Sequence, residues 1–218
     1  GNGQDVLSQL IWGSRISVFV ALCAGLLSTA IAVIVGLSWG YIRSFAGEFV
    51  GFIVNLFLVI PSLPLMIVVA AYLQNGGLGV IILVVVLTGW AWGSRVLRSQ
   101  TQTLRSRDFV TAAAFSGDSS ARIIFHEIFP NMLSLIINNF FGAATAAALA
   151  EAGLEFLGLG DSTTVSWGTM LYWAQNNNVL LTGQWVLLFA PGLMIALLAV
   201  SMTFINFGVD RLSNPRLR

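Results

Sequence analysis

Five stretches of the chain are apolar throughout and contain no Asp, Glu, Lys, Arg or His: residues 16–42, 49–73, 76–94, 128–150 and 184–209. Each is long enough to cross the roughly 30 Å hydrocarbon core of a bilayer as an α-helix. The apolar residues are continuous and do not alternate with period two, which argues against the strands of a membrane barrel. The pattern therefore predicts five membrane-spanning helices, which satisfy their own backbone polar groups in lipid.

The predicted fold class is all-α, a polytopic bundle of transmembrane helices. Residues 1–15 are expected to form an external segment, residues 16–209 the transmembrane domain and residues 210–218 a tail. Pro61 and Pro64 interrupt the second span and Pro191 the last, so each predicts a kink. The stretch 142–150 is rich in Gly and Ala and predicts close packing between helices.

The composition supports a membrane protein, because 57% of the residues are hydrophobic and only 9% are charged. So few charges do not cover a water-facing surface of this size. A soluble domain and a basic nucleic-acid-binding module are therefore excluded. A disulfide scaffold is excluded as well, because Cys23 is the single cysteine.

The arginines are distributed unevenly between the two sides of the membrane. Five spans place the connections 43–48, 95–127 and 210–218 on one side, and these carry nine of the ten Lys and Arg residues, all of them arginine. The other side receives 1–15, 74–75 and 151–183, with Arg15 alone. Cytoplasmic connections carry an excess of basic residues, so the C-terminus is predicted to be cytoplasmic and the N-terminus of the chain external.

The long cytoplasmic connection 95–127 is predicted to contain two short helices. Asp108 is a good N-cap, and Gly117 is suited to closing a helix over residues 109–116 at its C′ position. Asp118 or Ser119 then caps a second helix, which runs toward Pro130.

One face of the first short helix is small and apolar, with residues at i, i+3, i+4 and i+7. This face consists of Phe109, Ala112, Ala113 and Ser116. Such a helix either docks in the groove of a partner protein or lies flat on the bilayer, held by arginines near anionic lipid. The spacing alone favours neither interpretation.

The outer connection 151–183 carries Glu151, Glu155 and Asp161 and no basic residue. Direct contact with a cationic group of a substrate is one interpretation. An acidic outer surface that follows the charge bias is the other, and it is favoured. Gly158 and Gly160 lie in a stretch that suits a tight turn at an external gate.

Several uncharged residues have two interpretations. Trp167, like Trp173 and Trp185, is expected to anchor the chain at the membrane interface. Asn138 and Asn139 lie within a span, where they either form hydrogen bonds between helices or line a translocation path. The single histidine, His126, forms no cluster of metal ligands or catalytic groups in the sequence, so no catalytic or metal site is predicted.

The stretch around the first short helix resembles the "EAA" loop of binding-protein-dependent ABC importer permeases. Ala112, Ala113, Gly117 and Pro130 match that pattern in register. Thr111 stands where the family usually has glutamate, and Phe129 where it usually has leucine.

The rest of the chain resembles the C-type subunit of the dipeptide/oligopeptide/nickel group of these permeases. The matching stretches are QDVLSQLIWGSR at 4–15, EAGLEFLGLG at 151–160, SWG at 166–168 and NPRLR at 214–218. The resemblance covers the chain in the right order. It also implies that the first of six family spans precedes residue 1.

The resemblance implies a type I ABC importer transmembrane subunit in a prokaryotic plasma or inner membrane. Its partners would be a sister permease, packed against the Gly- and Ala-rich stretch, two ATP-binding subunits and an external solute-binding protein. The helix at 109–116, with Asp108, Thr111 and Gly117, would be the coupling helix. ATP and Mg²⁺ would bind to the ATPase subunits, because the chain has no phosphate-binding G-x-x-x-x-G-K-[ST] motif.

The expected function is therefore a non-catalytic permease subunit that imports peptides. Import of oligosaccharides or nickel by the same family is the alternative. A stand-alone secondary transporter or channel is a second class of function, but such proteins usually carry ionisable groups within the membrane, and the five spans have none. A membrane-embedded enzyme is disfavoured for lack of clustered catalytic groups.

Overall fold

The computed structural model describes residues 5–73 and 77–213 and, within these ranges, contains helices and no strand. The helices are α1 (Val6–Tyr41), α2 (Phe45–Val59), α3 (Ser62–Tyr72), α4 (Gly77–Arg105), α5 (Asp108–Phe115), α6 (Ser120–Arg122), the π-helix η1 (Ile123–Ile128), α7 (Phe129–Asn131), α8 (Leu133–Phe156), α9 (Trp167–Asn176) and α10 (Val186–Ser213). The connection 74–75 and the NPRLR stretch at 214–218 lie outside the described residues. The all-α prediction is confirmed for the described part.

Among the described residues, four helices are long and apolar enough to cross a membrane: α1, α4, α8 and the Val186–Val209 part of α10. The pair α2 and α3 makes a fifth span if it is counted as one, although it is bent by 88° at a short break. The predicted second span is therefore broken rather than kinked. Pro61 causes the break, because the residue before a proline is driven out of the helical conformation and Ile60 is extended, with ψ of 125°.

The other two prolines in predicted spans do not break their helices. Pro64 lies in the first turn of α3, where the missing N–H is not needed for an intrahelical bond. Pro191 lies inside α10, which continues past it.

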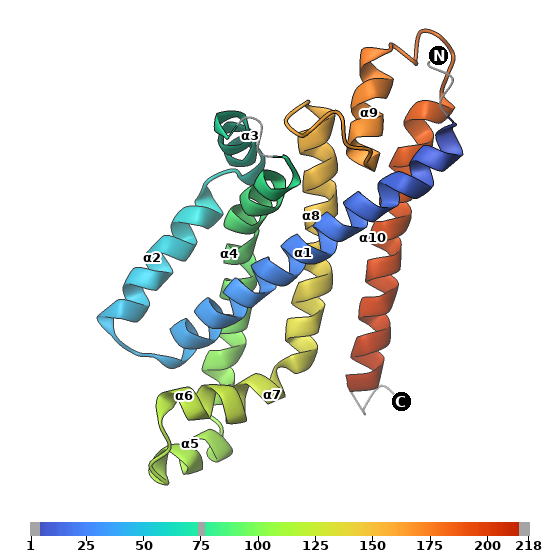
Figure 1. Cartoon of the computed structure of the whole chain (residues 1–218). Coiled ribbons are helices and arrows are strands. Elements are labelled where there is room, and N and C mark those ends of the chain that lie inside the picture. Colours follow the sequence, from blue (N-terminus) through green and yellow to red (C-terminus); the bar gives the residue numbers. More distant parts are fainter. Residues whose placement is uncertain (1–4, 74–76, 214–218) are drawn as a thin grey trace.

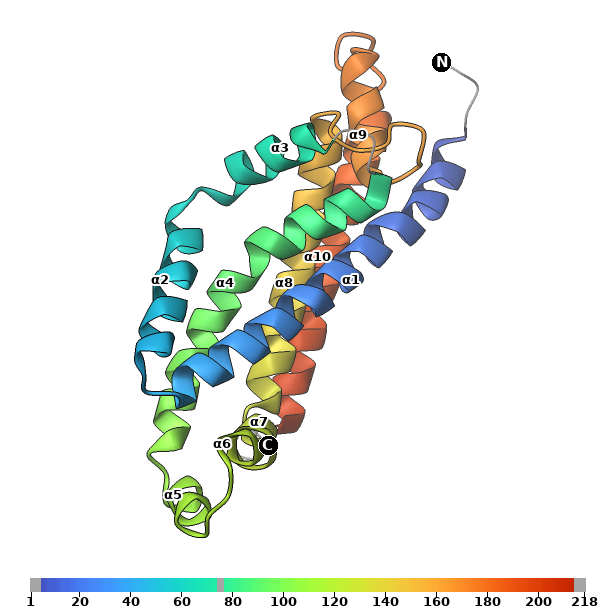
Figure 2. The same ribbon diagram turned by 60° about the vertical axis from the view of Figure 1, so that its left-hand side comes forward.

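The helices form an elongated bundle in which α1 runs obliquely across α4 and α8, its two main partners (Figure 1). At one end lie α5, α6 and α7, together with the end of α10. At the opposite end lie α9 and the start of α1 (Figures 1 and 2). Below, the first is called the arginine end, because Arg43, Arg98, Arg105, Arg107 and Arg122 lie there, and the second the outer end.

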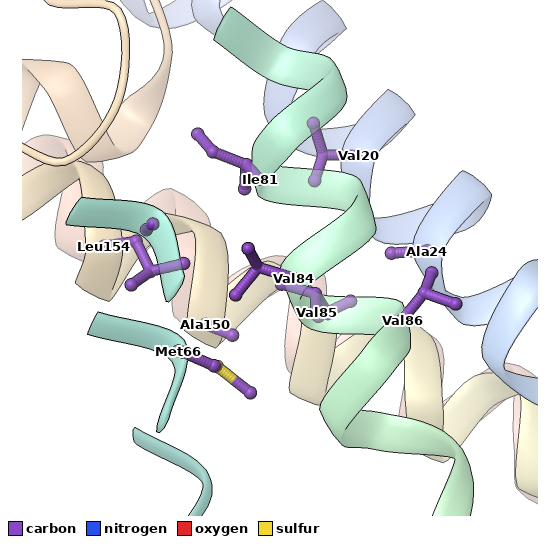
Figure 3. Close-up of a cluster of buried hydrophobic side chains, with 11 residues drawn as sticks. Val20, Ala24, Met66, Ile81, Val84, Val85, Val86, Ala150 and Leu154 are labelled. Carbon is purple, nitrogen blue, oxygen red and sulfur yellow. The ribbon is translucent and has the colours of Figure 1, made fainter. Parts of the chain in front are cut away.

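The largest buried cluster lies where α1, α3, α4 and α8 meet (Figure 3). Val20 and Val84 are fully buried in it, Leu154 joins it from α8 and Met66 from α3. Burying these side chains provides much of the contact that holds the helices together.

Small residues bring the helices into close contact within the chain. A Cβ on Gly25 of α1 would lie 2.7 Å from the Cα of Ala144 in α8. Ala144, Ala147 and Ala148 are buried by the chain's own helices. The close packing predicted for 142–150 therefore occurs within the chain for these three alanines.

Two predicted boundaries are wrong. Helix α1 begins at Val6, ten residues before the predicted span, because Asp5 accepts hydrogen bonds from the N–H groups of Leu7 and Ser8 and so caps the helix. Helix α8 continues to Phe156, so residues 151–156 are helical and do not belong to an external loop. Both errors arise because a charge-free stretch ends at the first ionisable residue, whereas a helix continues through one.

Candidate functional site

The first of two candidate sites is α5, the short helix at the arginine end. Its N-cap is Arg107, and its side chain makes no capping hydrogen bond. The prediction that Asp108 is the N-cap is therefore wrong by one residue. Asp108 lies in the first turn instead, where its negative charge interacts favourably with the helix dipole.

The C-terminal end of α5 is closed by Gly117, as predicted. Gly117 has a φ of +89°, which favours glycine. Its N–H donates to the carbonyl of Ala114, and the N–H of Asp118 donates to the carbonyl of Ala113, at 3.1 and 3.2 Å. This pair of bonds is a Schellman motif. Helix α5 therefore ends at a defined residue, and the motif fixes the direction in which the chain leaves it.

Helix α5 has a buried side and an exposed side, and of the four residues of its predicted apolar face only Ala113 packs toward the bundle. Val110 is 2% exposed and belongs to a buried cluster with Ile123 and Ile128 of η1. Ala113 is half-buried against the same cluster. The residues that face away from the bundle are Phe109, Thr111, Ala112, Phe115 and Ser116, and of these Phe115 is 89% exposed.

The second predicted helix of this connection consists of α6, η1 and α7 in succession. Ser119 is its N-cap and accepts a hydrogen bond from the N–H of Arg122. The side chain of Arg122 forms an ion pair with Asp118 at 3.2 Å. Pro130 is exposed in α7. These segments join α5 to α8 without a loop longer than a few residues, so α5 is attached firmly to the bundle.

The second candidate site is a buried polar cluster near the outer end, where Glu151 and Glu155 lie one turn apart on α8. Glu151 is 0% exposed and Glu155 is 2% exposed. The interpretation that they form an acidic outer surface is therefore wrong, and neither side chain is placed to meet a substrate in this conformation. Neither forms an ion pair among the described residues.

The two carboxyl groups connect three helices through serine hydroxyls. Ser17 of α1 donates to Glu151 Oε1 at 3.2 Å and accepts the N–H of Trp167 at 3.2 Å. Ser166 donates a hydrogen bond to Glu155 and caps α9 by accepting the N–H of Thr169. The cluster therefore attaches the start of α9 to both α1 and α8.

Trp167 is not an interfacial anchor, since it is 3% exposed. Its indole N–H donates to the carbonyl of Leu10 at 3.0 Å, and its ring packs with residues of α1 and α10. Trp173 and Trp185 are about half exposed, as an interfacial position requires. Three tryptophans that look alike in the sequence thus have different surroundings.

The predicted turn after α8 is present and tightly packed. Gly158 has a φ of +77°, and its N–H donates to the carbonyl of Glu155. A Cβ on Gly160 would lie 2.8 Å from Glu155 Cγ, and one on Gly168 would lie 2.7 Å from Glu155 Oε2. Glycines therefore enclose the buried carboxyl on two sides.

The asparagines of α8 lie in the bundle near the crossing of α1 and α4. The amide nitrogen of Asn139 donates to Thr29 Oγ1 of α1 at 3.5 Å, and its side chain lies against Gly93 of α4. This agrees with the interhelical interpretation of Asn139. Asn138 is half-buried.

A cavity of about 1090 Å³ opens at the outer end, between the start of α1, residues 162–165, α9 and the start of α10. Among the described residues its lining contains amides, hydroxyls and apolar groups but no charged side chain. Asp161 lies just before this segment, and hydrogen bonds from the side chain and N–H of Thr163 and the side chain of Thr164 lower its pKa below the ordinary value of 3.8.

Sequence reasoning missed Ser17, which completes the carboxyl cluster. The residues around Ser17 in the sequence do not indicate a distant hydrogen-bond partner, because a serine in an apolar run usually bonds to a carbonyl of its own helix. It also missed Trp39 and Arg98, which are stacked at the arginine end. The described residues contain no group of three or more His, Cys, Asp or Glu side chains placed to hold a metal ion.

The sequence profile of the family described as "Binding-protein-dependent transport system inner membrane component" matches residues 32–218. The oligopeptide transport system permease protein OppC of Mycobacterium tuberculosis (strain ATCC 25618 / H37Rv) is 36% identical over 199 residues, which are 90% of this chain and 67% of that protein. The dipeptide transport system permease protein DppC of Bacillus subtilis (strain 168) is 32% identical over 99% of this chain and 67% of its own length.

The fold is similar to that of a chain in a solved structure of the MetNI methionine ABC transporter in inward-facing conformations. The TM-score is 0.73 at 17% sequence identity, and the match covers 93% of this chain and 97% of that one. A second crystal form gives a TM-score of 0.74 at 15% identity. At this identity the likeness concerns the fold alone.

Proposed function

The chain belongs to the family of binding-protein-dependent transport system inner membrane components, and from this premise we propose that it is a permease subunit of an ATP-driven importer and forms half of a translocation path for peptides. The relatives named as oligopeptide and dipeptide permeases support the substrate class. A sister permease supplies the other half of the path, and an external binding protein delivers the peptide.

The observation that carries the proposal is the geometry of α5. The helix extends from the arginine end of the bundle (Figures 1 and 2) and is fixed on its inner side by Val110. Its outer side presents Ala112 and Phe115 to the surroundings. An exposed small and aromatic face on a firmly attached helix fits a groove in a partner protein. In this proposal the partner is an ATPase subunit, and α5 transmits its movement to the bundle.

The arginine end is assigned to the cytoplasm by the excess of basic residues. The C-terminus and α5 then face the ATPase subunits, which bind ATP and Mg²⁺. This chain has no catalytic role in the proposal. The outer end, with the turn at Gly158–Gly160 and the cavity beside α9, faces the binding protein. Asn138 of α8 is assigned to the wall of the path.

The test is the substitution Ala112→Arg, measured in proteoliposomes that hold the whole transporter. Ala112 is exposed on α5, so arginine leaves the bundle intact but does not fit a groove shaped for a small side chain. We expect peptide-loaded binding protein to stop stimulating ATP hydrolysis. Ala121→Arg is the matched control, because Ala121 is also exposed at the arginine end but lies outside α5. Equal stimulation in the wild type and Ala112→Arg would remove α5 from the coupling role.

The choice of Ala112 follows from the structure, because Ala113 is half-buried against the bundle. Arginine at 113 would displace α5 from the bundle and would not test the groove. The substrate class is tested in the same proteoliposomes with labelled dipeptides, oligopeptides, oligosaccharides and Ni²⁺. Uptake of peptides alone supports the proposal, and uptake of sugar or nickel in their place contradicts its substrate.

A further inference from the structure

A second cavity, of about 450 Å³, lies at the arginine end between the last turn of α1, the start of α2 and the lower part of α4. Its lining includes Trp39, Ile42, Arg43, Phe45, Glu48 and Arg98. Helices α1 and α4 meet closely here, since a Cβ on Gly40 of α1 would lie 2.6 Å from Thr101 Cβ of α4. The path of the chain around this corner is visible in Figures 1 and 2.

Trp39 holds one side of this cavity rigid. Its indole is 7% exposed and lies against α2, where a Cβ on Gly51 would be 2.7 Å from Trp39 Cζ2. The guanidinium carbon of Arg98 lies 3.9 Å from the centre of the same ring. A guanidinium stacked on tryptophan at this distance is attracted to the ring. Arg98 is therefore held in place rather than extended freely into solvent.

The charge of Arg98 has no anionic partner in the described part of the chain, where the single ion pair joins Arg122 to Asp118. The Nε of Arg98 is buried and has no hydrogen-bond partner there. Arg43 also lines the cavity without an ion pair, and Glu48 is the one acidic residue of the lining. The cavity thus has an excess of positive charge, which an anionic ligand would neutralise.

The start of α2 adds further donors to the same cavity. Helix α2 is 15 residues long, and the side chain of its N-cap, Ser44, makes no capping hydrogen bond. The first N–H groups of a helix have no partner within the helix, and they carry partial positive charge. Together with two arginines this arrangement suits a phosphate group.

The cavity also has an apolar side, which identifies the kind of molecule that carries the phosphate. Ile42 and Phe45 line it and are 45% and 83% exposed. Phe49, one turn further along α2, is 60% exposed. A free phosphate ion gains nothing from such side chains, whereas the acyl chains of a lipid do. We infer that this cavity binds the phosphate of an anionic phospholipid from the leaflet at the arginine end, with its acyl chains along α2.

The test uses the full chain, purified in mild detergent, depleted of lipid and then incubated with phosphatidylglycerol or phosphatidylcholine. Bound lipid is counted by native mass spectrometry, which requires no ATPase subunit, so the result is independent of the proposed transport function. We expect Arg98→Gln to lower the occupancy by phosphatidylglycerol about fivefold or more, as the loss of a charge-assisted hydrogen bond implies. Arg95→Gln is the control, because Arg95 is exposed on the same helix and does not line the cavity.

Equal phosphatidylglycerol occupancy in the wild type and Arg98→Gln would overturn the inference, as would equal occupancy by phosphatidylcholine and phosphatidylglycerol. Displacement of phosphatidylglycerol by millimolar inorganic phosphate would identify a free-anion site instead and would also overturn it. If Arg98→Gln does not fold, Arg43→Gln gives the same readout from an exposed position, where the substitution leaves the packing unchanged.

Discussion

Ser17 and Glu151, which are 134 positions apart in the sequence, are joined by a buried hydrogen bond of 3.2 Å from the serine hydroxyl to the carboxyl group. The same hydroxyl accepts the N–H of Trp167, the first residue of α9. One small side chain on α1 therefore connects the membrane-spanning helix α8 to the short helix at the outer end. The stability of that end depends on this group.

Ser17→Ala is expected to destabilise the chain by about 1–3 kcal/mol for each buried group left without a partner. Both Glu151 and the N–H of Trp167 lose a hydrogen bond. The measurement is the thermal unfolding midpoint of the purified chain in detergent, which should fall by several degrees. Ser14→Ala is the matched control on the same helix, because the Ser14 hydroxyl bonds to the carbonyl of Ile11 within its own turn. An equal midpoint for the two variants would contradict the role of the cluster.

Gly168→Ala is expected to separate α9 from α8. Its Cβ would lie 2.7 Å from Glu155 Oε2 and 2.9 Å from the Cα of Ala152, which is backbone and does not move easily. Overpacking of this kind costs about 1–3 kcal/mol. The measurement is proteolysis of residues 157–166 in proteoliposomes, which should become faster. Gly153→Ala, with open space around its Cβ, should leave the rate unchanged.

Gly117→Ala is expected to weaken coupling without affecting insertion. A non-glycine residue at a φ of +89° is strained by about 1–2 kcal/mol, and the strain falls on the end of α5. We expect the stimulation of ATP hydrolysis by loaded binding protein to fall severalfold. The control is Gly183→Ala, which imposes similar strain at a φ of +74° but at the outer end. Equal losses in the two variants would show that strain in general, and not α5, causes the effect.

Thr163→Val is expected to raise the pKa of Asp161 toward its ordinary value of 3.8. The Thr163 side chain makes the largest contribution to the lowered pKa, through a hydrogen bond of 2.6 Å. Because the pKa is depressed in the folded state, the stabilisation of this turn is fully present above pH 3.8 and is lost as the pH falls through the lowered pKa.

The pKa of Asp161 is measured as the pH midpoint of its NMR titration in carboxyl-labelled protein, for the wild type and for Thr163→Val. Asp5 is an internal control, because its pKa is lowered by Ser8 at a different site and should not change. An unchanged Asp161 midpoint in the variant would contradict the assignment of the hydrogen bond.

The membrane spans and the short helix α5 could be predicted from the sequence because their signals are local. A charge-free apolar stretch has few stable conformations in lipid other than a helix. The end of α5 at Gly117 is made by the N–H of Gly117, which donates to Ala114, and the N–H of Asp118, which donates to Ala113, so it depends only on neighbouring residues. The proline at position 61 predicts a kink in the second span, because a proline disrupts a helix, but it does not by itself specify a bend of 88°.

The surroundings of polar and aromatic side chains could not be predicted in this way. Glu151 and Glu155 follow an apolar span in the sequence and look like the start of an external loop, yet Ser17 of α1 and the turn and helix that follow α8 enclose them in the bundle. Trp167 is the residue type, and lies in the part of the sequence, expected of an interfacial anchor, but residues of α1 pack against it and bury it. Local sequence signals along the chain thus predict the helices, the segregation of charge between their ends and the C-terminal cap of α5. Which polar groups are buried, and against what, depends on contacts between separate segments, from Ser166 and Glu155, 11 residues apart, to Ser17 and Glu151, 134 residues apart, and these exist only once the helices have packed.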